Sequence, residues 1–420
     1  MRTIQFILTL LILTMFSQAQ MADLNLTRMR YGEPVQFYSA RMLGLAGSGL
    51  ASQGSVGNAL ENPALIFPQQ GTLTLTAGLM TNKLVEDRQF PYYDSFSGFN
   101  DFGSYSYNSN YHFAPYFQLG WILPLAHPVA VQAGRVPFLD FRYKYAEEVR
   151  DPFDKTDKLL GYNWIDQSGV LNQTFLAIGT QVVSGLKVGL KLGFLSGTID
   201  STMKIEPRVE GNLFSEQRID RRRTLSSTPV LFNLGLHYRV SERLSVGAFA
   251  QLPYTLKWDN HLKGDSMAVA EEIDYPLSLG GGLDYRFQNI LQARVFMDFI
   301  YSFSGNFKDS RTAELHYRDT FTLRGGVEHL FFKKQMPFRI GFSYATLPYN
   351  YNLANTWLTL GTGWYFSRWH VDLAAGLNHQ EFYQPDLFPD TIYGLDARTD
   401  LDRVQWTNYF FRFDVTINLF

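Results

Sequence analysis

The segment Tyr38–Phe67 reads YSARMLGLAGSGLASQGSVGNALENPALIF and is rich in glycine, alanine and serine. Such small side chains bury little apolar surface, so this stretch cannot build a core of its own. The chain that follows it reads as one strand after another. The sequence therefore predicts that the segment is enclosed by a barrel formed from the rest of the chain.

The residues after Gly71 repeat with a period of two, which is typical of strands that have one apolar and one polar face. Leu186, Val188 and Leu190, for example, alternate with Lys187 and Gly189. We predict strands near residues 71–84, 111–125, 129–145, 170–183, 186–203, 224–240, 243–258, 274–288, 290–303, 317–332, 335–348, 355–367, 369–382 and 404–420. The fold class is thus all-β, an antiparallel transmembrane barrel of about 14 strands, an even number as bacterial outer-membrane barrels require.

The connections between these strands alternate between two classes. Short ones such as 184–185 and 241–242 alternate with long polar ones such as 85–110, 146–169 and 204–223. Short turns face the periplasm in outer-membrane barrels and long loops face outward. Both chain ends would then lie on the periplasmic side, which places residues 20–70 at the periplasmic mouth of the barrel.

The polar face of the predicted strands is charged, with both signs present. A dry core could not hold so many unpaired charges, so a hydrated, ion-paired lumen around a plug is the better interpretation. A soluble barrel or sandwich is the alternative, but about 14 strands enclose a space too wide for side chains alone to fill. The charges of inward parity are Lys187, Lys191, Arg239, Asp284, Arg286, Arg294, Asp298, Arg324, Glu328, Arg339, Asp372, Arg412 and Asp414.

The first residues have the pattern of an export signal. Arg2 precedes an apolar run, and Ser17-Gln18-Ala19 suits signal peptidase. We expect a cleaved signal peptide at 1–19, a plug or hatch at 20–70 and the transmembrane barrel at 71–420. The absence of Cys excludes disulfides, 16% aromatic residues fit interfacial girdles, and a net charge of -2 gives no reason to expect nucleic acid as a partner.

Two parts of the chain resemble the FadL family of outer-membrane transport proteins. SARMLGLAGSG at 39–49 and NALENPAL at 58–65 resemble the family's N-terminal hatch, which also ends in Asn-Pro-Ala. MPFRIGFSY at 336–344 and NTWLTLGTG at 355–363 resemble its strands before the C-terminal hairpins. The resemblance implies that the hatch residues are Gly44, Gly47, Gly49, Asn62, Pro63 and Ala64.

The resemblance also implies a function. Family members carry hydrophobic small molecules, such as long-chain fatty acids or aromatic hydrocarbons, inward past lipopolysaccharide. Outer-membrane lipids and lipopolysaccharide are then expected partners, and the terminal Phe420 suits recognition by the barrel-assembly machinery. The same family includes PorV-like components of type IX secretion, so a shuttle or scaffold that binds secreted proteins is the alternative.

A break in the third predicted strand coincides with an inward kink that the family uses as a lateral gate. Gly134, Arg135, Val136 and Pro137 interrupt the alternation, and a proline cannot donate to the ladder. The sequence predicts a lateral opening here. An ordinary bulge near the end of the strand is the alternative.

Inward-facing aromatic residues are candidates for binding a hydrophobic cargo. Phe249, Phe296, Trp357 and Tyr365 have the required parity, and Arg324 or Arg339 could meet a carboxylate. The alternative for both arginines is an ion pair with an acidic residue across the lumen.

The chain shows no pattern of a catalytic or metal site. The Gly44–Gly49 stretch matches neither a dinucleotide fingerprint nor a phosphate loop, and the eight His form no close pairs. We expect no enzyme activity, no cofactor and no metal.

Overall fold

A computed structural model describes residues 24–420, except 54–56, 68–71, 95, 97, 126, 151–157, 209–215, 266, 289–291, 313–316, 333, 351, 396–399 and 420. The predicted signal peptide at 1–19 and Phe420 lie outside the described residues. No helix in the described part of the chain is long and apolar enough to cross a membrane.

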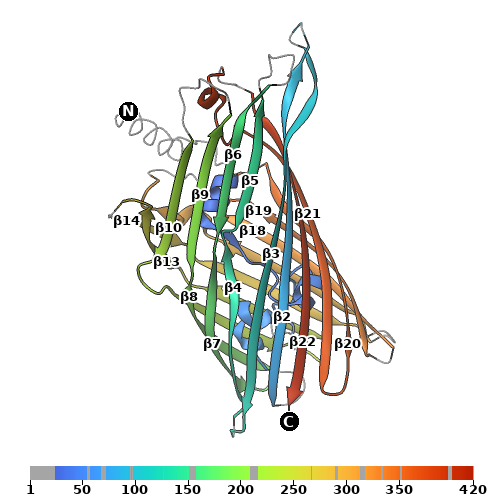
Figure 1. Cartoon of the computed structure of the whole chain (residues 1–420). Helices are drawn as coiled ribbons and strands as arrows, with labels where there is room; N and C mark the ends of the chain where they lie inside the picture. Colours follow the sequence, from blue (N-terminus) through green and yellow to red (C-terminus); the bar gives the residue numbers. More distant parts are fainter. Residues whose placement is uncertain are drawn as a thin grey trace.

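The molecule is a closed barrel in which each strand pairs with its sequence neighbours in antiparallel fashion (Figure 1). The ring closes where the last strand pairs with the first and where the third pairs with the fourth. Its strands are β2 (Leu73–Tyr93), β3 (Phe99–Leu123), β4 (Val129–Asp140), β7 (Val170–Val183), β8 (Leu186–Ser196), β11 (Val230–Arg239), β12 (Leu244–Gln251), β15 (Ser278–Arg286), β16 (Arg294–Ser302), β18 (Thr320–Phe331), β19 (Met336–Thr346), β20 (Ala354–Tyr365), β21 (Trp369–Gln384) and β22 (Asp402–Leu419).

Successive side chains of each strand point to opposite faces of the barrel wall, and those on the outer face are apolar and aromatic. On β22, Phe411, Phe413 and Ile417 are exposed, whereas Arg412 and Asp414 between them are buried inside. The same alternation continues around the ring. An exposed apolar belt of this kind is what a lipid bilayer covers.

A second sheet stands above the barrel wall, at the end away from the short turns. Its strands are β5 (Tyr143–Arg150), β6 (Leu159–Ser168), β9 (Thr198–Pro207), β10 (Gln217–Leu225), β13 (Tyr254–Leu262), β14 (Val269–Tyr275) and β17 (Lys308–Asp309). Most continue a barrel strand after a break. Gly169 (φ 134°) and Gly197 (φ 156°) make two of the breaks, and Pro229, Pro253 and Pro276 lie at three others.

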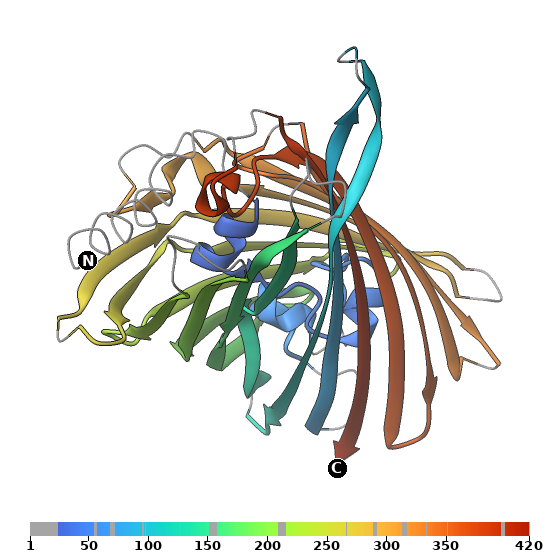
Figure 2. The ribbon, with the colours of Figure 1, turned by 45° about the horizontal axis from the view of Figure 1, so that its top comes forward.

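The described residues of the N-terminal segment, 24–53 and 57–67, lie inside the ring of strands (Figure 2). It contains α2 (Leu24–Tyr31), β1 (Glu33–Pro34), α3 (Ala40–Gly44), α4 (Asn58–Glu61) and the 3-10 turn η1 (Pro63–Leu65). Residues 40–52 are buried throughout. Two further 3-10 turns, η2 (Ser304–Asn306) and η3 (Asp390–Tyr393), belong to connections between strands.

The position of this segment differs from the expectation that residues 20–70 sit at the turn end of the barrel. Its first described residues, 24–36, lie at the opposite end, against the second sheet. Arg30 forms ion pairs with Glu271 and Asp309 at 3.1 and 2.6 Å, and Tyr275 donates to the carbonyl of Tyr31 at 2.9 Å. These contacts with β14 and β17 hold the segment there, and the chain then descends to β2.

The predicted closed antiparallel barrel of 14 strands is confirmed. The predicted loops, however, are largely strand. The segment 85–110 is mostly the extended β2–β3 hairpin, which projects beyond the rest of the molecule (Figure 1), and 146–169 and 204–223 contain strands of the second sheet. Tertiary pairing overrides their polar composition, which reads as loop in the sequence.

Candidate functional site

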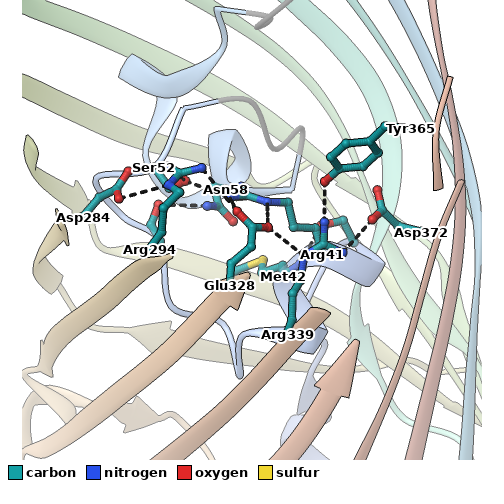
Figure 3. Close-up of polar contacts among 12 residues, drawn as sticks. Arg41, Met42, Ser52, Asn58, Asp284, Arg294, Glu328, Arg339, Tyr365 and Asp372 are labelled. Carbon is teal, nitrogen blue, oxygen red and sulfur yellow. Dashed lines mark hydrogen bonds and ion pairs between the residues drawn. The ribbon is translucent and has the colours of Figure 1, made fainter. Parts of the chain in front are cut away.

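A buried ion network joins the N-terminal segment to the barrel wall (Figure 3). Arg41 on α3 contacts both carboxylate oxygens of Glu328 on β18, at 3.0 and 3.1 Å. Arg339 on β19 contacts the same carboxylate at 2.8 Å and Asp372 on β21 at 2.6 Å. One carboxylate therefore neutralises cations from the segment and from the wall.

The network continues to the other side through Arg294 on β16. This guanidinium lies 3.4 Å from Glu328, pairs with Asp284 on β15, and donates to the hydroxyl of Ser52 at 2.9 Å. Glu328 is 2% exposed, and Arg339 is fully buried. Charges this deep persist only when they are paired and hydrogen-bonded.

Three further wall residues bind the backbone of the segment. Asp298 accepts from the amide of Gly49 at 2.7 Å and of Leu50 at 3.1 Å. Asp414 accepts from the amide of Ala40, the first residue of α3, at 2.6 Å. The Lys191 ammonium donates to the carbonyl of Leu60. The wall thus satisfies polar groups that the segment cannot satisfy itself.

Inward-facing glycines let the segment approach the wall closely. A Cβ at Gly341 on β19 would lie 2.3 Å from the Leu45 carbonyl carbon, and one at Gly189 on β8 would lie 2.3 Å from Pro63. Gly44 and Gly361 face each other, and a Cβ on either would meet the other's Cα within 3 Å. Backbone packs against backbone at these positions, which only glycine allows.

The predicted hatch residues occupy defined positions in this packing. The Asn62 amide donates to the carbonyls of Leu50 at 2.7 Å and Leu236 at 3.0 Å, and its oxygen accepts from the amide of Ala64 at 3.1 Å. Pro63 and Ala64 form η1. Gly47 and Gly49 have φ values of 80° and 129°, which glycine adopts without strain.

The pairing between β3 and β4 stops at the predicted break. The ladder runs from Leu123 opposite Val129 to Phe117 opposite Arg135, and the described register ends there. Up to Arg135 the burial of β4 alternates, whereas residues 136–141 are buried on both faces. The strand therefore turns into the lumen at this point, and a register shift between Pro137 and Leu139 on its β7 side accompanies the turn.

A short strand from the N-terminal segment takes over the edge that β3 leaves. In β1, Glu33 pairs with Asp140 and Pro34 pairs with Leu139, and the amide of Val35 donates to the carbonyl of Phe138 at 2.9 Å. The wall between β3 and β4 is thus replaced by an internal pairing. We call this place the seam: residues 112–116 of β3 and residues 136–141, which are the end of β4 and Phe141 after it.

Above the seam, side chains of β3 bridge to the backbone of β5. The amides of Asn108 and Asn110 on β3 exchange hydrogen bonds with the backbone of β5 at Ala146 and Lys144, with distances between 2.7 and 3.2 Å. At the level of the seam, Arg142 donates to the carbonyl of Phe113 at 2.9 Å. The seam is consequently bounded below by the β3–β4 ladder and above by asparagine side chains.

A cavity of about 460 Å³ lies on the lumen side of the seam. Residues 31–36 and Phe138 and Leu139 form the wall nearest the seam. Other residues of the N-terminal segment and residues from β8 around to β22 also line it. Of the predicted cargo-binding residues, Phe249, Trp357 and Arg324 line this cavity.

The other three predicted residues lie in or beside the ion network. Phe296 packs against the guanidinium groups of Arg41 and Arg294 at 5.7 and 4.9 Å from its ring centre. Arg339 donates to the hydroxyl of Tyr365 at 2.5 Å. Both arginines follow the ion-pair alternative, since Arg324 pairs with Glu61 at 2.8 Å and Arg339 pairs with Asp372.

A buried carboxyl group sits in the second sheet above the seam. Glu147 on β5 accepts from the amide of Asn163 at 2.5 Å and from the hydroxyl of Tyr145. Burial, reinforced by the nearby charge of Asp386, raises the pKa of Glu147 to about 8. This part of the molecule therefore changes charge near neutral pH.

Several of these residues escaped the sequence interpretation. The inward glycines could have been found, because glycine recurs at inward parity on strand after strand. Asn108, Asn110 and Arg142 carry no such signal, since polar residues in an apparent loop need no explanation. No group of His, Cys, Asp and Glu able to hold a metal is found among the residues that the structure describes.

The barrel resembles solved structures of transport proteins. A Pseudomonas aeruginosa FadL homologue superposes with a TM-score of 0.63 at 14% identity, covering 92% of this chain and 99% of that one. The P. putida toluene transporter TodX gives 0.57 at 16%, and the Ralstonia pickettii toluene transporter TbuX gives 0.56 at 14%, each with the same coverage. This chain has the FadL fold.

Sequence comparisons add a narrower match. A family model described as BamG matches residues 97–276, which is less than half of the chain. It runs from the top of the β2–β3 hairpin through the seam and most of the second sheet. No curated protein matches the sequence. The resemblance to the FadL fold thus rests on architecture.

Proposed function

We propose that this protein is an outer-membrane transporter that takes up hydrophobic small molecules through its plugged lumen and releases them sideways at the seam. The observation that carries the proposal is the junction of the cavity with the seam. The cavity wall at residues 31–36 is the same stretch that pairs with the freed edge of β4. A cargo in the cavity is therefore separated from the seam by β1 and its neighbours.

The physical chemistry of a hydrophobic cargo favours such a route. Each methylene prefers apolar surroundings by roughly 0.8 kcal/mol, so an aqueous pore gives little help whereas a lateral exit delivers the molecule to the bilayer. Fatty acids and aromatic hydrocarbons both meet this description. The toluene transporters with the same fold support aromatic compounds as the cargo.

In this proposal the N-terminal segment is the hatch. The ion network and the wall glycines hold residues 40–67 in place, whereas residues 32–36 form the part that moves. Export would deliver the chain to the outer membrane, with the short turns and the C-terminus toward the periplasm. The boundaries 20–70 for the hatch and 71–420 for the barrel follow from the same assignment.

Uptake by whole cells tests the function. Cells that display the chain should accumulate labelled hexylbenzene faster than cells with an empty vector, and a heat-modifiable band in the outer-membrane fraction verifies a folded barrel. Equal uptake at verified surface levels would refute transport.

The BamG match favours a second candidate, a role in the assembly or secretion of other outer-membrane or surface proteins. The projecting hairpin supports it, because Tyr92, Tyr93, Phe96 and Phe99 expose 49%, 49%, 90% and 56% of their surfaces near its tip. Replacing these four residues with Ser should abolish cross-linking to a partner protein if this candidate is right. Uptake of hexylbenzene should then be independent of the chain.

A further inference from the structure

One stretch of the cavity wall carries a cluster of side-chain amides. Four of them, Asn355, Asn378, Gln380 and Asn408, lie with Trp357 and Trp406 on the neighbouring strands β20, β21 and β22. The register places Asn378 opposite both Trp357 and Asn408, and Gln380 opposite Trp406. These six residues form one continuous patch, which we call the amide patch.

The amide patch is tied together but keeps hydrogen-bonding capacity. Asn408 donates to Asn378 at 3.1 Å, Asn378 donates to the carbonyl of Thr356 at 2.8 Å, and Gln380 donates to the carbonyl of Ala354 at 3.1 Å. Each amide has two N–H donors and an oxygen with two lone pairs, so these bonds use only part of the capacity. The same bonds hold the side chains in position.

Unpartnered groups occur in the same patch. Within the described residues, the indole N–H groups of Trp357 and Trp406 and the oxygen of Asn355 are buried without a hydrogen-bond partner. An unsatisfied buried polar group costs about 1–3 kcal/mol, so a polar partner that reached these groups would lower that cost.

The cations that line the cavity already have partners away from the amide patch. Arg28 pairs with Glu33 at 3.0 Å and Arg324 pairs with Glu61 at 2.8 Å. The ammonium of Lys191 is held by the carbonyl of Leu60. A carboxylate bound at the amide patch would meet only neutral amides and indoles there, and an unpaired charge in a buried site is strongly unfavourable.

Another part of the cavity wall is aromatic. Tyr254 and Tyr275 stack with ring centres 4.7 Å apart, and Phe138 of the seam lies 6.0 Å from Tyr254. The cavity thus has an aromatic part, which reaches the seam at Phe138, and a separate neutral, hydrogen-bonding part on β20–β22.

We infer that the cavity selects an uncharged amphiphile, a molecule with an apolar or aromatic body and a hydroxyl or amide head group that binds the amide patch. This inference rests on the proposed transport function and narrows its preferred cargo, with plain hydrocarbons and ionised fatty acids bound more weakly. The head group would meet β20–β22 while the body lies against the aromatic part.

Binding to the purified protein in nanodiscs tests this inference, with Trp357 and Trp406 as built-in fluorescent reporters. Three probes share a hexyl chain and a benzene ring: 4-hexylphenol, hexylbenzene and 4-hexylbenzoate. Empty nanodiscs correct for partition into lipid. We expect 4-hexylphenol to bind roughly tenfold more tightly than the other two, since one or two net hydrogen bonds supply that ratio.

Substitutions separate the amide patch from the rest of the lumen. Asn378→Leu should remove most of the preference for the phenol while hexylbenzene binding stays within about twofold. Gln132→Leu is the matched control, because Gln132 is a buried lumen amide bonded to Gln118 at 2.8 Å and lies outside the cavity wall. It should keep the preference, and heat-modifiable migration verifies that both variants are folded.

The inference is overturned if hexylbenzene or 4-hexylbenzoate binds as tightly as the phenol, or if Asn378→Leu keeps the full preference. Uptake of hexylbenzene by cells, measured in parallel, shows which claim has failed. Chain-dependent uptake without a phenol preference would refute only the inference, whereas loss of uptake would refute transport itself.

Discussion

The two sides of the barrel wall are built differently. On one side β2, β21 and β22 run unbroken for 21, 16 and 18 residues. On the other side strands such as β12 and β15 stop after 8 and 9 residues, and the chain restarts in the second sheet. The unbroken side carries Arg412 and Asp414, which bind the backbone of the segment. The broken side also binds the segment, through Lys191 and Asp298, but it lets β4 turn inward. Both halves of the wall therefore anchor the segment, and only the broken half bends.

Removing the central carboxylate should have the largest effect. Glu328→Gln leaves Arg41, Arg294 and Arg339 around a neutral amide, and breaking a buried ion pair in this way costs about 3–5 kcal/mol. Denaturant unfolding followed by tryptophan fluorescence measures the loss. Glu272→Gln is the control, because Glu272 forms an exposed pair with Lys257 and its loss should leave the midpoint unchanged.

A wall glycine that contacts the segment should be the next most sensitive position. Gly341→Ala places a Cβ 2.3 Å from the backbone at Leu45, and such overpacking costs about 1–3 kcal/mol. Gly325→Ala on the neighbouring strand is the control, since the nearest atom there is 4.0 Å away. Hydrogen exchange of residues 40–52 should accelerate in the first variant only. Equal exchange in both would show that the segment is not held by close packing.

The glycine breaks should matter on the bending side. Gly169→Ala combines a φ of 134° with a Cβ 2.4 Å from the carbonyl of Thr198, and we expect the second sheet to lose about 1–2 kcal/mol of local stability. Gly264→Ala is the matched control, because its φ is 94° with no atom within 4 Å. Native-state hydrogen exchange at β6 and β9 should distinguish the steric contact of the new Cβ from the strain of a positive φ. Identical effects of the two variants would assign the whole loss of stability to the positive φ.

The last prediction is a pH dependence confined to the second sheet. Because the pKa of Glu147 is raised to about 8, the folded state favours the protonated carboxyl, and the local stability should fall as pH rises from the unfolded pKa of about 4.5 toward 8. Exchange of β5 amides, corrected for the intrinsic rate, reports this fall. Glu147→Gln should abolish it and Glu148→Gln, at the exposed neighbour, should not. A pH-independent rate in the unsubstituted chain would contradict the assignment.

The comparison also explains what the sequence could predict. The period of two gave all 14 barrel strands, because one face meets lipid and the other meets charge. The break at Gly134–Pro137 was visible because proline and a change of parity leave a local mark. These features depend on residues that are near in sequence.

Other features depend on pairing between distant residues. Much of the second sheet was predicted as loops, since residues such as Arg218, Asp220 and Arg222 are polar and yet pair with β9. The predicted position of residues 24–36 was wrong. Contacts of Arg30 and Tyr31 with β14 and β17, which are distant in sequence, place these residues at the loop end. The partner of the freed β4 edge could not be predicted either, since Glu33–Pro34 is too short to read as a strand.

A cross-link between β1 and β4 tests the lateral exit most directly. The chain has no Cys, so Pro34→Cys with Leu139→Cys introduces one pair at residues that are partners in the register. Leu119→Cys with Ala133→Cys places a control pair in the continuous β3–β4 ladder. Oxidation of the first pair should stop hexylbenzene uptake and a reductant should restore it, while the control pair leaves uptake unchanged. Unaltered uptake with β1 locked to β4 would show that the cargo does not leave through the seam.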